Sequence, residues 1–435
     1  MNSIIKPRER EALVQSLRAG VVPRYGQHLI QVGRRKEIEA MEKTIEAIAS
    51  GGTSFRLVIG DYGSGKSFFI NLVKNIALEK KLVTVSADLN PTRRLLGSSG
   101  QARSLFGELM KNMATKTKAD GEAMMSVVEK FIASAMDEAK QRTRATDRII
   151  REKLLPLEEM LNGYDFTTVL KAYYRGYESG NDSLKQNAVR WLRGEFSTKT
   201  EANQLLGVRS IVNDDNIYDQ LKLMSKFVSI AGYSGLYVFL DEMVNLYKLH
   251  NTVARNGNYE QILRILNDVL QGNVQEIGFL LAGTPEFLTD TRRGLYSYEA
   301  LQSRLAENPY VHGDTVDFSG PVIRLKNLTP EEFYVLIKNI RHVYAFGDPE
   351  KYIVPDEALS AFMKLSSSRL GNDYFRTPRT TIVSFINFLS ILEQNPNENW
   401  ENVLDTGDLN FRRDGGDDVV IKQDGDSDEF ANFVL

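Results

Sequence analysis

The chain of 435 residues has no cysteine, only four histidines and no long hydrophobic run. Without cysteine it forms neither disulfides nor a thiolate metal site, which fits a reducing compartment. The histidines, at positions 28, 250, 312 and 342, are scattered without metal-ligand spacing. No apolar run approaches the roughly 18 residues that span a bilayer, and the N-terminus lacks a signal-peptide pattern. We therefore expect a cytoplasmic protein with no membrane partner.

The chain also has little net charge, −3 at pH 7. This balance argues against a surface that nucleic acid covers throughout, although it leaves room for local basic grooves. Hydrophobic residues make up 42% of the sequence, which is enough for a large core at this length. Length and composition together predict a globular protein of two or three domains.

The most informative segment is an apolar strand pattern that runs directly into a glycine-rich loop. The strand pattern covers 55–60, the loop over 60–67 reads Gly-Asp-Tyr-Gly-Ser-Gly-Lys-Ser, and an apolar helical pattern follows. In a phosphate-binding loop of this form, backbone N–H groups surround the β-phosphate, the lysine reaches the β and γ oxygens, and the hydroxyl ligates Mg²⁺. The segment therefore predicts a site for ATP and Mg²⁺.

Lys66 is thus a predicted catalytic residue and Ser67 a predicted metal ligand. The nucleotide-binding residues predicted from this segment are Gly60, Asp61, Tyr62, Gly63, Ser64, Gly65, Lys66, Ser67 and Phe68.

A second apolar run, over 235–242, ends in two carboxylates and is typical of a Walker B strand. A buried strand carries Asp241 to the carboxyl edge of the sheet, where it holds Mg²⁺ through water. Glu242 then projects far enough to polarise the attacking water, which makes it the predicted catalytic base. The alternative interpretation is a strand that ends in a solvated acidic turn.

Five strand patterns alternate with helical patterns, which predicts an α/β fold with a parallel, doubly wound sheet. The predicted strands cover 55–60, 82–87, 236–241, 277–283 and 322–325. Because the interval between the second and third strands is far longer than a crossover needs, we expect a helical insertion at about 100–215.

This pattern divides the chain into an N-terminal segment (1–30), a P-loop ATPase core with its insertion (31–325), a helical lid (326–404) and a tail (405–435). The lid is expected to begin at the capped helix start Thr329-Pro330. The tail has seven acidic residues between Asp414 and Glu429, so we expect it to be largely disordered.

Polar residues after the fourth strand are further candidates for catalysis. Thr284 is a candidate sensor of the γ-phosphate, although it is equally suited to cap the helix that Pro285 begins. Arg304 is a candidate for acting in trans on the nucleotide of a neighbouring subunit. Arg292 and Arg293 are further candidates for this role, and for Arg304 the alternative is a solvated surface arginine.

The lid contributes a proline-marked helix start, Phe-Arg-Thr-Pro-Arg, over 375–379. Arg379 is the preferred candidate for a nucleotide-binding residue at the γ-phosphate, and Arg376 is the second choice. Helix capping and surface charge are the alternative roles for both.

Several of these motifs resemble those of AAA+ proteins. The segment Val-Gly-Arg-Arg-Lys-Glu-Ile over 32–38 is similar to the G-R-x-x-E segment of the Orc/Cdc6-like and STAND branches. That resemblance implies that Arg34 helps to hold the adenine. The Ser-Arg pair at 303–304 is similar to the trans-acting arginine motif of clamp-loader and origin-recognition AAA+ proteins.

More narrowly, the chain resembles the BrxC/BrxD-type P-loop family of BREX phage-defence systems over about 13–395. The resemblance is carried by Leu-Arg-Ala-Gly-Val-Val-Pro-Arg (17–24), the loop 60–67, Val-Arg-Trp-Leu-Arg-Gly-Glu (189–195) and Ala-Gly-Tyr-Ser-Gly-Leu (231–236). It implies a cytoplasmic ATPase of an antiviral operon that assembles with itself around DNA. It also implies a partner enzyme such as a helicase, nuclease or methyltransferase.

Two stretches have a composition that suits nucleic acid. The stretch 140–153 has six basic residues against two acidic ones on an amphipathic pattern. The stretch 171–193 interleaves Tyr173, Tyr177 and Trp191 with cations, which suits base stacking. The alternatives are a solvated face for the first stretch and core packing for the aromatic residues of the second.

Together these patterns favour an AAA+-like ATPase that forms an oligomer and engages DNA without sequence preference. The alternative is a nucleotide-controlled switch or scaffold, which hydrolyses ATP slowly and recruits a partner protein.

Overall fold

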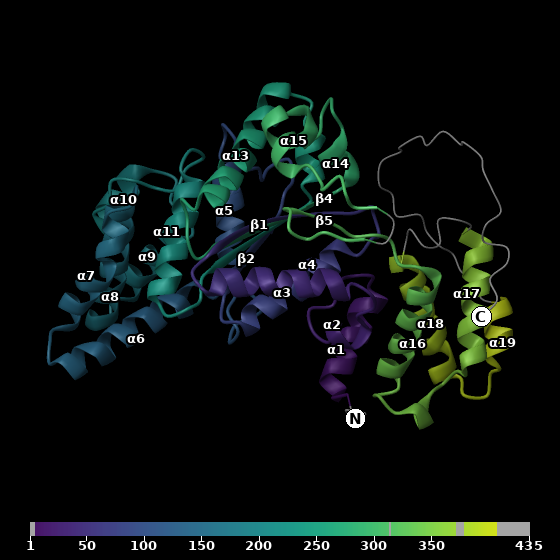
Figure 1. Ribbon diagram of the computed structural model, residues 1–435. Helices are drawn as coiled ribbons and strands as arrows, with labels where there is room; N and C mark the ends of the chain where they lie inside the picture. The colour runs from purple at the N-terminus through teal and green to yellow at the C-terminus, as the bar shows by residue number, and fades with distance from the viewer. Residues whose placement is uncertain (1–4, 313–314, 371–377, 407–435) are drawn as a thin grey trace.

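A computed structural model of the chain describes residues 5–312, 315–370 and 378–406. The predictions for Arg376 and for the acidic tail beyond residue 406 lie outside these residues. Figure 1 shows a central sheet with helices on both faces, a helical insertion at one end and a helical bundle at the other.

Within the described residues, the sheet has five parallel strands, as the sequence predicts. They are β1 (Thr53–Ile59), β2 (Val83–Asp88), β3 (Leu236–Asp241), β4 (Ile277–Gly283) and β5 (Val322–Arg324). Their order across the sheet is β2-β3-β4-β1-β5, so β4 pairs with β1 on one side and with β3 on the other. This order places the end of β4 between the glycine-rich loop and the two carboxylates that end the Walker B pattern.

Helices cover both faces of the sheet, which explains why its strands are nearly continuous apolar runs. In β3, Leu236, Val238 and Leu240 belong to one apolar core, and Tyr237 and Phe239 belong to the other. The second core also holds α3 (Arg35–Ala49) and α4 (Lys66–Glu79). These two helices lie below the sheet in Figure 1.

The insertion between β2 and β3 is helical and packs into the first core. Its helices are α5 (Gln101–Lys111), α6 (Met124–Arg142), α7 (Thr146–Glu158), α8 (Gly163–Ser179), α9 (Asp182–Leu192), α10 (Lys199–Leu206) and α11 (Ile217–Ile230). Aromatic rings join these helices, because Phe166 lies edge-on to Phe227 and Trp191, with ring centroids 5.8 and 6.1 Å away. The insertion is therefore continuous with the body of the protein.

Further helices follow β3 and β4 on the same face of the sheet. They are α12 (Val244–Tyr247), α13 (Thr252–Gln271), α14 (Pro285–Thr289), the 3₁₀ turn η1 (Leu295–Ser297) and α15 (Glu299–Leu305). Tyr259 of α13 packs edge-on to Phe287 of α14 and donates a hydrogen bond of 2.7 Å to the carbonyl oxygen of Arg293. These contacts fix the segment that leaves β4.

The helical bundle has a core of its own, which the two ends of the described chain build together. Its helices are α16 (Pro330–Tyr344), η2 (Pro349–Lys351), α17 (Asp356–Leu370), α18 (Pro378–Gln394) and α19 (Trp400–Thr406), joined by α1 (Pro7–Arg18) and α2 (Gln27–Ile30). The expected capping box begins α16, since Thr329 and Glu332 each accept a hydrogen bond from the backbone N–H of the other. Leu13 and Val14 of α1 share the core with Phe385 of α18.

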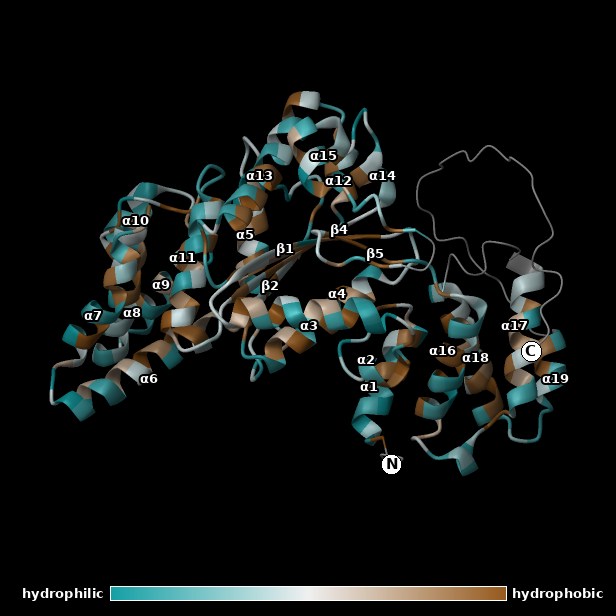
Figure 2. Cartoon of the chain, in the orientation of Figure 1, coloured by the Kyte–Doolittle hydropathy of each residue, from teal (hydrophilic) through white to brown (hydrophobic). Residues whose placement is uncertain are grey.

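Hydrophobic residues lie mainly on the strands and on the helix faces that turn toward them (Figure 2). The opposite faces of the helices are polar, as expected for amphipathic helices around a common core. Of the helices in the described part of the chain, none is both long and apolar enough to cross a membrane.

Candidate nucleotide-binding site

The candidate site is a cavity of about 420 Å³ at the carboxyl ends of β1, β3 and β4. One part of its wall is polar and includes Arg34, Ser64, Lys66, Ser67, Asp241, Glu242, Thr284 and Arg379. The other part is apolar and includes Leu17, Val21, Val22, Pro23, Ile30, Val32, Leu328, Leu336 and Ile382. The cavity therefore combines a charged wall suited to phosphates with an apolar wall suited to a nucleobase.

The glycine-rich loop joins β1 to α4, so the first N–H groups of α4, which have no acceptor within the helix, border the cavity. Gly63 and Gly65 have φ of 83° and 84°, in the left-handed region that favours glycine. Gly60 is required by close packing, because a Cβ there would collide with Ser64 Oγ and lie 2.9 Å from the carbonyl oxygen of Leu325. The loop thus has the backbone form that the sequence predicts.

The side chains of the loop are arranged around the Lys66 amine. Its Nζ donates hydrogen bonds of 2.8 Å to the carbonyl oxygens of Gly60 and Asp61 and lies 5.6 Å from the ring centroid of Tyr62. Burial lowers the pKa of Lys66, and nearby carboxylates oppose that shift. Since an ammonium has three donors, one is left for a phosphate oxygen. Phe68, in the first turn of α4, also lines the cavity.

The predicted metal ligands are brought together, because Ser67 Oγ donates a hydrogen bond of 2.9 Å to Asp241 Oδ2. Hydroxyl and carboxylate oxygens are hard ligands, and Mg²⁺ is commonly held by one or two such groups together with water and phosphate oxygens. Across residues 5–312, 315–370 and 378–406, no group of three His, Cys, Asp or Glu side chains is placed to hold a metal ion. The pair therefore fits Mg²⁺ delivered with a nucleotide better than a metal caged by protein.

Glu242 has a backbone conformation unusual for its residue type, with φ of 56°. Its N–H donates a hydrogen bond of 2.7 Å to Asp241 Oδ1, and its side chain lines the cavity. Burial raises the pKa of Glu242, and the negative charges of Asp241 and Asp88 raise it further. A carboxylate with a raised pKa is a stronger base, which suits a residue that takes a proton from water.

Thr284 is 3% exposed at the end of β4, and its Oγ1 has no hydrogen-bond partner. It occupies the position before α14, but its side chain makes no capping hydrogen bond. The cap that the sequence offered as an alternative is therefore not formed. The buried Ser64 Oγ likewise has no partner. Buried polar atoms without partners are uncommon, and both of these residues line the cavity.

Arg34 connects the loop to the start of the bundle. Its Nη2 donates hydrogen bonds to the carbonyl oxygens of Ser64, at 3.2 Å, and of Lys326, and its Nη1 lies 3.6 Å from Glu37. Arg379 reaches the cavity from α18. Both arginines thus line the candidate cavity, and their contacts with the adenine and the γ-phosphate stay predictions.

Arg304 lies elsewhere, exposed at the end of α15 and outside the residues that line the cavity. Its Nη1 donates a hydrogen bond of 2.8 Å to the carbonyl oxygen of Ala300. Arg293 is used within the fold, since its Nη2 donates to the carbonyl oxygen of Tyr247 at 3.2 Å. Within a single chain, Arg304 therefore does not reach the nucleotide site.

The aromatic stretch in the insertion does not offer the stacking surface that its composition suggests. Tyr173 and Trp191 are each 1% exposed, and Trp191 Nε1 donates a hydrogen bond of 2.9 Å to the carbonyl oxygen of Ser210. The stacking interpretation is wrong for these two residues, because they pack in the core. Tyr177 remains exposed.

The basic stretch at the end of α6 and in α7 lies on the surface, but its charges are paired. The ion pairs are Arg142–Glu138, Arg144–Glu152, Arg148–Glu152, Arg151–Asp147 and Lys153–Glu138, with N–O distances of 2.7–3.2 Å. Five cations thus share three carboxylates, which offset part of the positive charge that the sequence suggests.

Two features of the site were not predicted from the sequence. One is Asp88, which ends β2 and is the register partner of Asp241 in β3. The other is the apolar wall, to which α1 and the segment after it contribute. Asp88 directly follows the strand predicted over 82–87, and this was the only signal for it. No local pattern identifies the apolar wall.

The comparisons with known proteins agree with this geometry. The family model described as BREX system ATP-binding protein BrxC/D matches residues 5–408. That range includes α1, the sheet, the insertion and the bundle. No curated protein matches the chain. The chain therefore belongs to the family of BREX system ATP-binding proteins BrxC/D.

Proposed function

We propose that this protein is a Mg²⁺-dependent ATPase of the AAA+ class, which acts as an oligomer in the cytoplasm together with DNA and a partner enzyme. The observation that carries the proposal is the convergence of Lys66, the Ser67–Asp241 pair and Glu242 on one cavity. A binding site alone does not need a carboxylate with a raised pKa beside the loop lysine.

Each polar residue of the cavity has a different role in hydrolysis. Ser67 and Asp241 would hold Mg²⁺, which would supply positive charge to the β and γ oxygens. Lys66 donates to a phosphate oxygen, and Glu242 takes a proton from the attacking water. Thr284 Oγ1 is a hydroxyl without a partner and is suited to orient that water or a γ oxygen.

Arg304 supports the oligomeric part of the proposal, because it is exposed and does not reach its own nucleotide site. Exposed apolar side chains follow it in the segment before β5, with Tyr310 85% and Val316 49% exposed. Arginine and exposed apolar side chains are both common in protein interfaces. We propose that Arg304 enters the site of a neighbouring copy, as an arginine finger does.

Mixed assemblies test this placement of Arg304. Arg304→Ala and Lys66→Ala proteins are each expected to lack turnover, while an equal mixture recovers it. The reason is that about a quarter of the interfaces in a head-to-tail assembly then combine an intact loop with an intact Arg304. The measurement is phosphate release across a series of mixing ratios.

Arg292→Ala is the matched control, since it removes an exposed arginine from the turn after α14 and is expected to keep normal turnover. No recovery at any mixing ratio, or a monomer at all concentrations in ATP, contradicts the role of Arg304.

DNA is the partner we propose for the assembled protein, through its phosphates and without sequence preference. Because the arginines of α6 and α7 are held in ion pairs, a single chain is expected to bind weakly, and assembly is expected to multiply the contacts. A slowly hydrolysed ATP analogue should therefore raise the affinity for two unrelated duplexes equally, and added salt should lower it steeply.

The measurement is fluorescence anisotropy over a salt titration, with and without the analogue. Lys66→Ala, which is expected to lose the nucleotide, serves as the control and should show no increase with the analogue. If no duplex binds at low salt with the analogue present, the alternative is favoured, namely a switch that recruits a partner protein.

A further inference from the structure

The helix α1 is first in the sequence, yet it packs as part of the C-terminal bundle. Leu13, Val14 and Leu17 lie in one apolar core with residues of α16 and α18, such as Phe333 and Phe385. This core is separate from the two cores that hold the sheet. A movement of the bundle relative to the sheet would therefore carry α1 with it.

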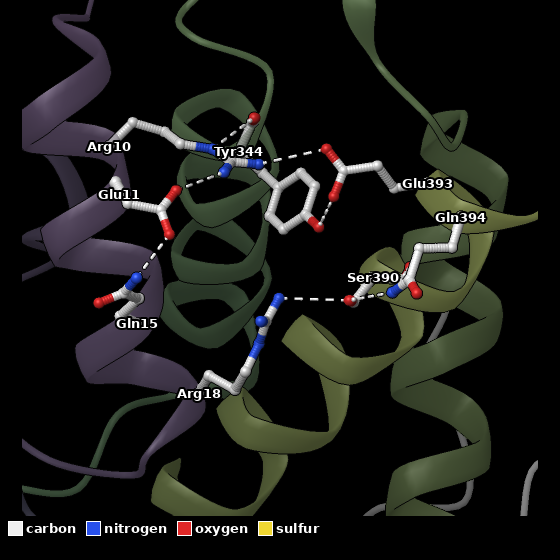
Figure 3. A network of polar contacts seen from close by, with 8 residues as sticks. All are labelled: Arg10, Glu11, Gln15, Arg18, Tyr344, Ser390, Glu393 and Gln394. Carbon is white, nitrogen blue, oxygen red and sulfur yellow. Dashed lines mark hydrogen bonds and ion pairs between the residues drawn. The ribbon is translucent and has the colours of Figure 1, made fainter.

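A polar network also attaches α1 to the bundle (Figure 3). The Arg10 guanidinium lies 4.4 Å from the ring centroid of Tyr344, and its Nε donates a hydrogen bond of 3.2 Å to the carbonyl oxygen of the same residue. Glu393 of α18 accepts from both Arg10 Nη2, at 3.5 Å, and the Tyr344 hydroxyl. Arg10 is only 9% exposed, so its guanidinium is shielded from water, whereas the side chain of Glu393 is 47% exposed.

The last residue of α1 makes a second attachment to α18. Arg18 Nη2 donates a hydrogen bond of 3.2 Å to Ser390 Oγ (Figure 3). Arg18 lies two residues before Gly20, in the segment where the chain leaves α1. The end of α1 is therefore held against the helix whose first turn carries Arg379.

Gly20 brings the N-terminal segment close to the side chain of Arg379. It has φ of 65°, and a Cβ built on it would lie 2.8 Å from Arg379 Nε and 3.4 Å from Val383 Cγ2. Gly20 and Arg379 both line the nucleotide cavity. The absence of a side chain at position 20 thus leaves the space in which the Arg379 side chain lies.

We infer that α1 is a part of the lid, and that Gly20 is a positioning residue that holds the Arg379 guanidinium toward the γ-phosphate of a bound nucleoside triphosphate. This inference rests on the proposed function, in which the cavity takes ATP. Its consequence is selectivity for the triphosphate over the diphosphate. The guanidinium donates to the γ-phosphate, which ADP lacks.

Gly20→Ala tests the inference, because it places a methyl group against Arg379. We expect the ratio of ATP affinity to ADP affinity to fall roughly tenfold, which is the loss of one charge-assisted hydrogen bond, while ADP affinity changes little. The measurement is a binding titration of each nucleotide with Mg²⁺. Gly180→Ala is the matched control, because Gly180 has φ of 69° but nothing within 4 Å of its Cβ.

A double variant, Gly20→Ala with Arg379→Ala, distinguishes an effect through Arg379 from a general disturbance of the fold. In an Arg379→Ala background, which itself lowers the ratio, Gly20→Ala is expected to cause no further change. If Gly20→Ala does not fold, Arg18→Ala replaces it, since that bond is exposed and its loss is expected to lower the ratio in the same direction by less.

The inference is overturned if Gly20→Ala weakens ATP and ADP equally, or if its effect on the ratio persists without Arg379. If the unmodified protein binds neither ATP nor ADP, the proposed function itself is overturned. The two failures are therefore distinguishable in the same titration.

Discussion

Replacing Glu242 with glutamine is expected to preserve ATP binding and to lower turnover by roughly 10²- to 10⁴-fold, the usual contribution of a general base. Glutamine keeps the size and one acceptor oxygen of the side chain, but its amide cannot take a proton from water. The structure gives a reason to expect a large effect, since burial, Asp241 and Asp88 all raise the pKa of Glu242. The measurements are a nucleotide titration and the steady-state release of phosphate.

Glu286→Gln is the matched control for this experiment. Glu286 is an exposed carboxylate in α14 whose charge acts on Lys66, but it does not line the cavity. Its replacement removes the same charge from the same neighbourhood, so turnover should change little. Turnover at the unmodified rate in Glu242→Gln would show that another group activates the water.

The second large effect is expected for Lys66→Ala, which should weaken ATP binding by roughly 10- to 100-fold. The Lys66 amine is held by two loop carbonyl oxygens, and its third donor is directed at a phosphate oxygen when ATP binds. Its partial burial strengthens the interaction with an anionic ligand, because little water screens it. The measurement is a titration with a fluorescent ATP analogue.

Lys74→Ala is the control on the same helix. Burial also lowers the pKa of Lys74, but its Nζ donates a hydrogen bond of 2.9 Å to Ser86 Oγ and lines a different, polar cavity of about 270 Å³. Its loss is expected to leave ATP affinity unchanged. Equal weakening by both replacements would show that the loss of affinity is not specific to the loop lysine, which would contradict its assigned role.

The sheet and the loop were predictable because their signals are local. All five strands lie within two residues of the predicted bounds, since a strand covered on both faces is a continuous apolar run. The form of the loop follows from glycines at positions whose backbone or packing excludes a side chain, as at Gly60 and Gly65. The carboxylates at 241 and 242 follow from the end of such a strand.

The parts that were not predictable depend on contacts between distant residues. The periodicity of α1 indicates an amphipathic helix, but it does not indicate that its partner lies more than 300 residues away in α16 and α18. Asp88 lies next to Asp241 because of the register of β2 with β3, which the sequence does not specify. The mixture of aromatic and basic residues in the insertion is compatible with both a stacking surface and a core. In the structure, Tyr173 and Trp191 are buried in the core.

A structure of the protein with Mg²⁺ and a non-hydrolysable ATP analogue tests the central claim most directly. We predict that the β-phosphate lies within the loop 60–67, that the metal is bound by Ser67 and held near Asp241, and that the base packs on the apolar wall formed by Val21, Ile30 and Leu336. A nucleotide bound outside this cavity, or a triphosphate remote from Lys66 and Glu242, would contradict the account.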